Sequence, residues 1–187
     1  MEFTVTLERC NDMFFSFENG KCDPIEMNED EPGCISGCIS VDDKQIGSII
    51  LYEFYNECDF YDMCDALSGD CEVIASAICG KRGTVLKKYL PNQSEFEAIF
   101  ILDHISIDNE YRGKGIGSDI IKNLLHMLRF QFGDGCSIFL CASDYESAKE
   151  YGFDSDEYKI GCTRLINFYK QLGFVVVKDN VMVYNEN

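Results

Sequence analysis

Alternating hydrophobic and polar residues dominate the first part of the chain, and this period of two predicts β-strands. Residues 2–8 alternate, with three apolar residues on one side. Residues 34–55 are predicted to form a β-hairpin, with I-S-G-C-I-S-V and I-G-S-I-I-L-Y-E-F-Y as strands and D-D-K-Q as the turn. Between these stretches, residues 10–33 contain Asn-Gly, Asp-Pro and Pro-Gly pairs, so we expect a loop there.

Strand-like patterns return in the second half of the chain. Residues 96–107 read F-E-A-I-F-I-L-D-H-I-S-I, and residues 137–142 form a shorter apolar run. Two further strands, F-V-V-V-K and V-M-V-Y, flank an Asp-Asn turn at 179–180. These runs predict one long strand followed by three short ones.

A change to a period of about 3.6 marks the predicted helices. Residues 60–79 suggest one or two helices, with Gly69 as a point of division. Apolar residues between 116 and 128 share one face of a further helix. Residues 161–172 predict another helix, and the acidic residues 143–158 predict a loop or a short helix.

The resulting order of elements is β, loop, β, β, α, β, α, β, α, β, β. This order predicts an α/β (α+β) fold, in which helices cover a mixed central sheet. The length of 187 residues favours a single domain over residues 1–187. A hydrophobic content of 46% is sufficient for a packed core.

The net charge of −17 narrows the range of partners. A chain of this charge repels polyanions, so nucleic acid and an anionic membrane are disfavoured, and a cationic substrate suits its field. The charge could equally serve solubility alone. No apolar run approaches the ~20 residues of a membrane span, and the N-terminal residues lack the regions of a signal peptide. We therefore expect a cytoplasmic protein.

Eleven cysteines are a high number for a chain of this length. Without an export signal, reduced thiols are expected rather than disulfides. Zinc sites need closely spaced Cys or His pairs, and the sequence has no C-x-x-C; its nearest pairs are Cys34 with Cys38 and Cys136 with Cys141. We therefore predict no metal site, and we interpret most of these cysteines as small buried hydrophobic residues.

The phrase R-G-K-G-I-G at residues 112–117 follows the strand 96–107 and leads into a helix. Glycines let a backbone approach a phosphate closely, and a helix N-terminus offers unpaired N–H groups and a positive dipole. A dinucleotide fingerprint needs G-x-G-x-x-G, and a P-loop needs Lys before Ser or Thr, so the spacing excludes both. Two interpretations remain from these residues alone, a tight turn without a ligand and a cradle for an anion.

The phrase resembles the acetyl-coenzyme A motif of the GNAT family of N-acetyltransferases, in which Arg or Gln precedes x-x-Gly-x-Gly or Ala. Arg112, Gly115 and Gly117 fill this pattern. A second match lies downstream, where L-I-N-F-Y-K-Q-L-G-F at 165–174 resembles the family's last helix and the start of its next strand. The resemblance covers residues 96–184 and, by topology only, the hairpin. It implies a GNAT fold with a sheet of about six to seven strands.

The resemblance implies a donor site for acetyl-coenzyme A as co-substrate. The backbone from Arg112 to Ser118 would clamp the pyrophosphate, and the strand edge at Ile105 and Ile107 would orient the pantetheine arm. Arg112 could add charge or pack structurally, and Lys114 could touch a phosphate or lie in solvent. The residues implied on the donor side are Ile105, Ile107, Arg112, Gly113, Lys114, Gly115, Ile116, Gly117 and Ser118.

The implied reaction is direct attack of an amine on the thioester, which needs an acid for the leaving thiolate and a base for the amine. The family often has a Tyr at this position of its last helix, shortly before Gly-Phe and near the thioester sulfur, and Tyr169, followed by K-Q-L-G-F, fits that position; the alternative is an interior Tyr with a hydrogen bond. Alternation puts Asp103 on one strand face with Ile105 and Ile107, so Asp103 is the candidate base or a ligand of the substrate ammonium. His104 titrates nearer neutral pH but is expected on the other face.

The acceptor side departs from the family pattern. The family has two helices between its first two strands, and residues 10–33 show none, whereas residues 56–95 insert a helical segment between the predicted third and fourth strands. Glu53, Asp62 and Asp65 lie in an acid-rich stretch and are candidates for binding a cationic acceptor. An acidic helix face is more often simply solvated.

These features leave several functions open. The leading hypothesis is a cytoplasmic N-acetyltransferase acting on a primary amine of a small molecule or protein. The alternative is a non-catalytic acyl-coenzyme A sensor or interaction module on the same fold. The charge of −17 disfavours a toxin that acetylates charged transfer RNA. Family members often dimerise, so a homodimer is a possible assembly.

Overall fold

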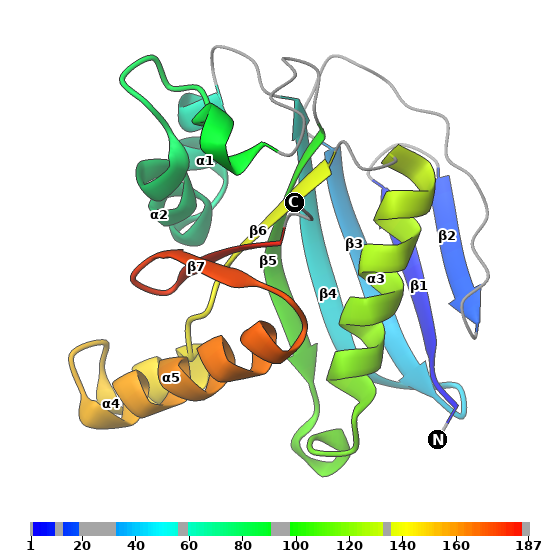
Figure 1. Ribbon diagram of the computed structural model, residues 1–187. Coiled ribbons are helices and arrows are strands. Elements are labelled where there is room, and N and C mark those ends of the chain that lie inside the picture. Colours follow the sequence, from blue (N-terminus) through cyan, green and yellow to red (C-terminus); the bar gives the residue numbers. More distant parts are fainter. Residues whose placement is uncertain are drawn as a thin grey trace.

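The computed structural model describes residues 2–9, 13–18, 33–55, 60–90, 98–132 and 136–184. Within these residues the chain forms a sheet of eight strands with five α-helices around it (Figure 1). The strands are β1 (Thr4–Arg9), β2 (Met13–Glu18), β3 (Gly33–Val41), β4 (Lys44–Tyr55), β5 (Ala98–Ile107), β6 (Cys136–Cys141), β7 (Val175–Lys178) and β8 (Val181–Tyr184). The helices are α1 (Phe60–Leu67), α2 (Gly69–Ile78), α3 (Ile116–Phe132), α4 (Tyr145–Tyr151) and α5 (Asp156–Gln171), with short 3-10 helices η1 (Lys87–Tyr89) and η2 (Asn109–Tyr111).

The strands form one mixed sheet in the order β2-β1-β3-β4-β5-β6-β8-β7. Among the described strands, β5 and β6 are the one parallel pair, and α3 makes the crossover between them. The predicted α/β class and the GNAT-like arrangement of a mixed sheet covered by helices are confirmed. The sheet has eight described strands instead of the predicted six to seven.

The additional strand is β2, which falls in the stretch that we predicted to be a loop. Its residues Met13–Glu18 pair antiparallel with β1. The stretch M-F-F-S-F-E contains three phenylalanines, a residue type that favours strands, but the surrounding Gly, Pro and Asp residues favoured a loop. The loop prediction is therefore wrong for these residues. Residues 10–12 and 19–32 of the same stretch lie outside the described residues.

The predicted hairpin and helices are confirmed with shifted boundaries. The turn between β3 and β4 consists of Asp42 and Asp43, whose φ angles of 50° and 61° are typical of a two-residue hairpin turn. Residues 60–79 form two helices, and the hydroxyl of Ser68 accepts a hydrogen bond from a backbone N–H in the first turn of α2. In the same way Ser155 caps α5, which therefore starts at Asp156 rather than at 161.

A β-bulge interrupts the pairing of β5 with β4. Ile50 pairs with His104 and Leu51 pairs with Leu102, so the intervening Asp103 has no partner of its own on β4. One extra residue in a strand shifts the alternation of its side chains by one position and can direct a side chain to a new place. The bulge therefore separates β5 into two segments of opposite alternation.

This bulge overturns the predicted faces of β5. Ile99 and Ile101 are buried in the core that contains α1 and α2, whereas Ile105 and Ile107 pack against the core that contains α3. Asp103 contacts Ser68 at the start of α2 and so lies on the side of Ile99 and Ile101, and the prediction that it shares a face with Ile105 and Ile107 is wrong. Simple alternation could not reveal the extra residue. The run I-L-D-H-I has two apolar residues followed by two polar ones, so the pattern does not show which residue is the extra one.

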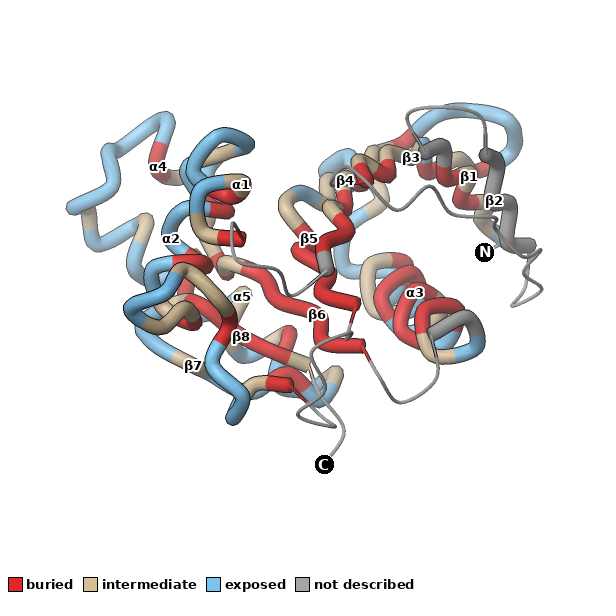
Figure 2. Tube along the Cα trace, turned by 90° about the horizontal axis from the view of Figure 1, so that it is seen from above, coloured by how far each residue is buried: buried red, intermediate tan, exposed pale blue. Residues whose placement is uncertain are grey.

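Two cores lie on opposite faces of the sheet (Figure 2). One core packs α3 and part of α5 against the sheet, and Phe100 and Ile120 are fully buried in it. The other packs α1 and α2 against the sheet, with Phe60 and Ile74 at its centre. The described part of the 56–95 insertion, residues 60–90, is thus built into a core and is not a surface appendage.

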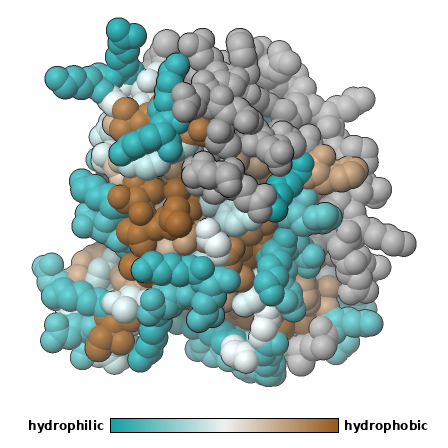
Figure 3. All heavy atoms as spheres, viewed as in Figure 1, coloured by the Kyte–Doolittle hydropathy of each residue, from teal (hydrophilic) through white to brown (hydrophobic). Residues whose placement is uncertain are grey.

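One edge of the sheet carries apolar surface. β7 forms this edge, and its residues Val175 and Val176 are exposed. Hydrophobic surface is visible on this face of the molecule (Figure 3). β8 separates this edge from β6. In the described part of the chain, no helix combines the length and the apolar character that a membrane crossing requires.

The packing of α2 yields a test on neighbouring residues. Ile74 is fully buried and Val73 is 45% exposed. We expect Ile74→Ala to lower the free energy of unfolding by about 2–4 kcal/mol through lost burial and a cavity. Val73→Ala should change it by less than about 0.5 kcal/mol. Urea unfolding followed by circular dichroism measures both, and equal losses in the two variants would contradict the described packing.

Candidate functional site

A cavity lies where β5 and β6 separate. Their parallel pairing ends at Leu102 and Leu140, whereas β5 continues to Ile107, and the two strands diverge beyond this point (Figure 1). No described strand pairs with this part of β5 on the side of β6, so alternate backbone groups there have no sheet partner. The cavity in this gap has a volume of about 640 Å³, which suits a small-molecule ligand.

The cavity collects side chains from elements far apart in the sequence. The ends of β5 and β6, the glycine turn, α2, α4 and α5 all contribute to its lining. The sequence-predicted residues that line it are Asp103, Ile105, Ile107, Arg112, Gly113, Gly115, Ile116, Gly117, Ser118 and Tyr169. The fold therefore brings all the predicted donor-side residues except Lys114, together with the two candidate catalytic residues, to one cavity.

The glycine turn places the N-terminus of α3 at this cavity. Gly113 and Gly115 have φ angles of 72° and 85°, which residues with a Cβ adopt only under strain. The side chain of Ile116 is buried and anchors the first turn of α3 in the core. The first intrahelical hydrogen bond runs from the Asp119 N–H to the Gly115 carbonyl, so the preceding N–H groups have no partner within the helix. This arrangement can bind an anion.

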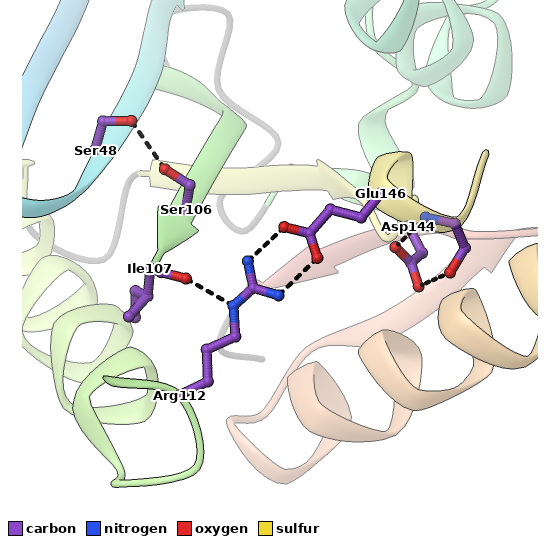
Figure 4. A network of polar contacts seen from close by, with 7 residues as sticks. Ser48, Ser106, Ile107, Arg112, Asp144 and Glu146 are labelled. Atoms are coloured by element: carbon purple, nitrogen blue, oxygen red, sulfur yellow. Dashed lines mark hydrogen bonds and ion pairs between the residues drawn. The ribbon is translucent and has the colours of Figure 1, made fainter. Parts of the chain in front are cut away.

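Arg112 connects the glycine turn with α4 (Figure 4). Its Nε donates a hydrogen bond of 2.6 Å to the Ile107 carbonyl. Its two terminal nitrogens donate to the two carboxylate oxygens of Glu146 at 2.7 and 2.6 Å. The hydrogen bonds from Arg112 lower the pKa of Glu146 below its usual range. Arg112 thus combines charge with a structural role, and it occupies one of the backbone acceptors at the end of β5.

Lys114 does not line the cavity. Its side chain is exposed, and its Nζ lies 5.1 Å from the centre of the Tyr111 ring. A lysine above an aromatic ring is held by a weak cation–π contact. The Lys114 side chain thus lies in solvent beside Tyr111, and its contact with a phosphate stays a prediction.

Tyr169 lies on α5 and turns into the cavity lining, with only 6% of its surface exposed. Its ring packs against Phe168 and Phe174, with centroid distances of 5.1 and 5.5 Å. Burial raises the pKa of Tyr169 to about 12. No described residue forms a hydrogen bond with its hydroxyl. Because a buried hydroxyl without a partner is costly, its position in a cavity points to a bound ligand as the missing partner.

Asp103 reaches the cavity from the bulge of β5. Its Oδ1 accepts a hydrogen bond of 2.6 Å from the hydroxyl of Ser68, and the Cys71 thiol lies 3.7 Å from the same oxygen. Ser68 at the same time accepts from the Cys71 N–H at 3.1 Å and so caps α2. The bulge therefore directs Asp103 toward the inserted helix α2 and links that helix to β5.

Asp70 and Tyr145 line the cavity and were missed by the sequence reasoning. Asp70 is only 9% exposed, and the hydroxyl of Tyr145 donates a hydrogen bond to its Oδ1. Burial raises the pKa of Asp70 above its usual range, and the hydrogen bond from Tyr145 acts in the opposite direction. Asp70 belongs to the acid-rich stretch that the sequence singled out, but composition could not show which of its acids is buried at the site.

The acids that the sequence proposed for the acceptor lie elsewhere. Asp62 and Asp65 are exposed on α1, and Glu53 is buried on β4. None of the three lines the cavity. The structure therefore does not bring them together with Tyr169 or Asp103.

The described cysteines and other metal-binding side chains give no metal centre. Within the described ranges, no three His, Cys, Asp or Glu side chains gather closely enough to hold an ion. Of the eight described cysteines, four are buried as expected of small hydrophobic residues, three are partly buried and Cys38 is exposed, so burial holds for half of them.

A known protein family matches the sequence over the region that contains the site. A family model described as "Acetyltransferase (GNAT) domain" matches residues 69–176, which is more than half of the 187 residues. The match includes the glycine turn, Asp103 and Tyr169. A search of the curated proteins found no significant match.

A search of solved structures found similar chains at low sequence identity. Arabidopsis thaliana Naa50 in complex with the bisubstrate analogue CoA-Ac-MVNAL is 17% identical, with coverage of 81% of this chain and 72% of that chain and a TM-score of 0.43. Arabidopsis thaliana NAA60 in complex with a bisubstrate analogue is 12% identical, with coverage of 82% and 77% and a TM-score of 0.44. AtaT complexed with acetyl-methionyl-tRNAfMet is 14% identical, with coverage of 81% and 71% and a TM-score of 0.43.

The backbone of the glycine turn can be tested with two alanine variants. Gly115 has a positive φ, and a Cβ there would meet open space, so the cost of Gly115→Ala is strain alone, about 1–2 kcal/mol. A Cβ at Gly117 would lie 3.4 Å from Ile107 Cδ1, an ordinary contact, and alanine favours the helix. Gly117→Ala should therefore leave the free energy of unfolding unchanged within about 0.5 kcal/mol or raise it. Chemical denaturation compares them, and a reversed order would contradict the described turn.

Proposed function

Because the chain belongs to the GNAT acetyltransferase family, we propose that it is an N-acetyltransferase that transfers an acetyl group from acetyl-coenzyme A to a primary amine. The observation that carries the proposal is the single cavity lined by the glycine turn, the unpaired edge of β5 and the buried hydroxyl of Tyr169. Each of these three features supports one part of the reaction.

The pyrophosphate of the donor would bind at the N-terminus of α3. This helix has 17 residues, and its first N–H groups and its dipole favour a negative ligand. Gly115 and Gly117 leave room for close approach because neither carries a side chain. Arg112 lines the same cavity and would supply charge to a phosphate in exchange for its contact with Glu146.

The pantetheine arm of the donor would lie along β5 beyond Leu102. Amide groups of an extended chain can pair with the backbone groups that no strand covers, as an added strand would. Ile105 and Ile107 hold this edge in place through their packing on the core of α3. A hydrogen bond of 3.0 Å between the hydroxyls of Ser48 and Ser106 ties the same segment to β4 (Figure 4).

The chemical step would be direct attack of the neutral amine on the thioester carbon. The C–N bond forms, the C–S bond breaks, and the coenzyme A thiolate takes the proton of the Tyr169 hydroxyl. The tyrosinate then takes the surplus proton from the new amide nitrogen, so Tyr169 ends in its starting state. The raised pKa of about 12 keeps Tyr169 protonated at neutral pH, as a general acid must be.

The acceptor would bind as an ammonium ion near Asp103. This carboxylate lines the cavity at the point where β5 and β6 begin to separate. A carboxylate in this position favours a cation and fits the overall charge of −17. The proposed substrate is therefore a primary amine of a small molecule or of a protein.

The role of Tyr169 is testable by substitution to phenylalanine. We expect Tyr169→Phe to lower kcat by about 100-fold or more, while the Kd for coenzyme A changes less than about 3-fold. Tyr151, which is 53% exposed on α4 and does not line the cavity, provides the control variant Tyr151→Phe. The acetylated product should be followed by mass spectrometry, because thiol dyes would also label the eleven cysteines.

The outcomes separate the alternatives. Equal turnover in Tyr169→Phe and wild type would remove the proposed acid. Binding of acetyl-coenzyme A in calorimetry without transfer to any amine would favour a non-catalytic acyl-coenzyme A-binding module. No binding of acetyl-coenzyme A would sink the proposed function as a whole.

A further inference from the structure

We propose that Asp70, supplied by the inserted helix α2, takes the proton from the acceptor ammonium, and that Tyr145 holds the Asp70 carboxylate in position. The inference rests on the proposed function and assigns to the inserted segment the deprotonation of the acceptor. It also fixes the acceptor class, since the substrate would be a primary amine that arrives protonated. Asp103, the base candidate from the sequence, would then bind the ammonium.

Burial and position distinguish Asp70 from the other acids of its stretch. Asp70 as a whole residue is only 9% exposed, yet it lines the same cavity as Tyr169. The Tyr145 hydroxyl donates a hydrogen bond to one carboxylate oxygen of Asp70, and Cys141 lines the same cavity. The buried hydroxyl of Tyr169, which has no partner among the described residues, is independent evidence that the cavity holds a ligand.

No cation compensates the charge of Asp70. In the described part of the chain, no Lys or Arg forms an ion pair with it, and the charged group that acts on it is the like charge of Asp103. Burial and this neighbour both raise the pKa of Asp70. A buried carboxylate of this kind gains from an arriving cation and accepts its proton more readily than an exposed one.

The fold fixes Asp70 firmly. Ser68, two residues before Asp70, caps α2 and donates to Asp103 at 2.6 Å, so α2 is tied to the bulge of β5. The buried side chains of Cys71 and Ile74 hold the same helix in the core. Groups on a packed helix keep their geometry better than groups on a loop, as proton transfer requires.

The proposed proton transfer conserves atoms and charge. The acceptor R-NH3+ loses one proton to the Asp70 carboxylate and becomes R-NH2, and Asp70 becomes neutral. The amine then attacks the thioester, with Tyr169 handling the remaining proton transfers. Asp70 releases its proton to solvent before the next cycle, so one proton leaves per amide formed.

The test compares an acceptor that is charged at neutral pH with one that is not. Propylamine is an ammonium ion under these conditions, whereas O-methylhydroxylamine is uncharged and needs no initial deprotonation. We expect Asp70→Asn to lower kcat for propylamine by about 100-fold and kcat for O-methylhydroxylamine by less than about 5-fold. Asp70→Glu should restore part of the propylamine activity, and raising the pH should partly rescue Asp70→Asn by deprotonating propylamine in solution.

Tyr145→Phe and a control complete the design. Tyr145→Phe keeps the ring and removes the hydroxyl, so it should lower kcat for propylamine more than it changes KM, with little effect on O-methylhydroxylamine. Glu72→Gln alters an exposed acid on the same helix that does not line the cavity, and it should match wild type. Melting temperatures identify any variant that fails to fold. If Asp70→Asn does not fold, kcat for the two acceptors is compared between Asp70→Glu and wild type instead.

The contrary outcomes are distinct. Equal losses of kcat for both acceptors in Asp70→Asn would overturn the inference, since a structural defect does not discriminate between them. A wild-type protein that binds acetyl-coenzyme A but acetylates neither amine would overturn the acceptor class. Absence of acetyl-coenzyme A binding in calorimetry would reject the proposed function itself and the inference with it.

Discussion

The separation of β5 from β6 beyond Leu102 and Leu140 is the constraint on which the site depends. Backbone groups in the middle of a sheet are costly to leave unpaired, so a gap between two parallel strands persists only where something else occupies it. Arg112 satisfies one carbonyl at the end of β5, and the crossover helix α3 begins directly after the glycine turn at the same end. The gap, the turn and the helix N-terminus are therefore consequences of one departure from regular pairing.

The other end of the cavity is built by the bulge and the inserted helix. The extra residue in β5 directs Asp103 away from its expected face and toward Ser68. Ser68 begins α2, and α2 brings Asp70 to the cavity. Because α1 and α2 fill one of the two cores, the insertion serves both stability and the proposed acceptor side.

The sequence signals of the proposed donor side are local. The glycine spacing, the strand before it and the Tyr shortly before Gly-Phe are short patterns, and the fold brings them to one cavity. The bulge at Asp103, the pairing of Arg112 with Glu146 and the burial of Asp70 all depend on tertiary contacts between distant segments. Strand β2 was missed because turn-forming residues on both sides outweighed its three phenylalanines. Local patterns carry no information on such contacts.

Hydrogen–deuterium exchange with and without coenzyme A tests the central claim most directly, because the proposed donor site is made of backbone amides. The account predicts slower exchange in residues 103–107 and 113–118 when coenzyme A is added. The amides of β1, Thr4–Arg9, lie three strands from β5 and should not change. Unchanged exchange in both predicted segments at saturating coenzyme A, or protection confined to another part of the chain, would contradict a donor site in the gap between β5 and β6.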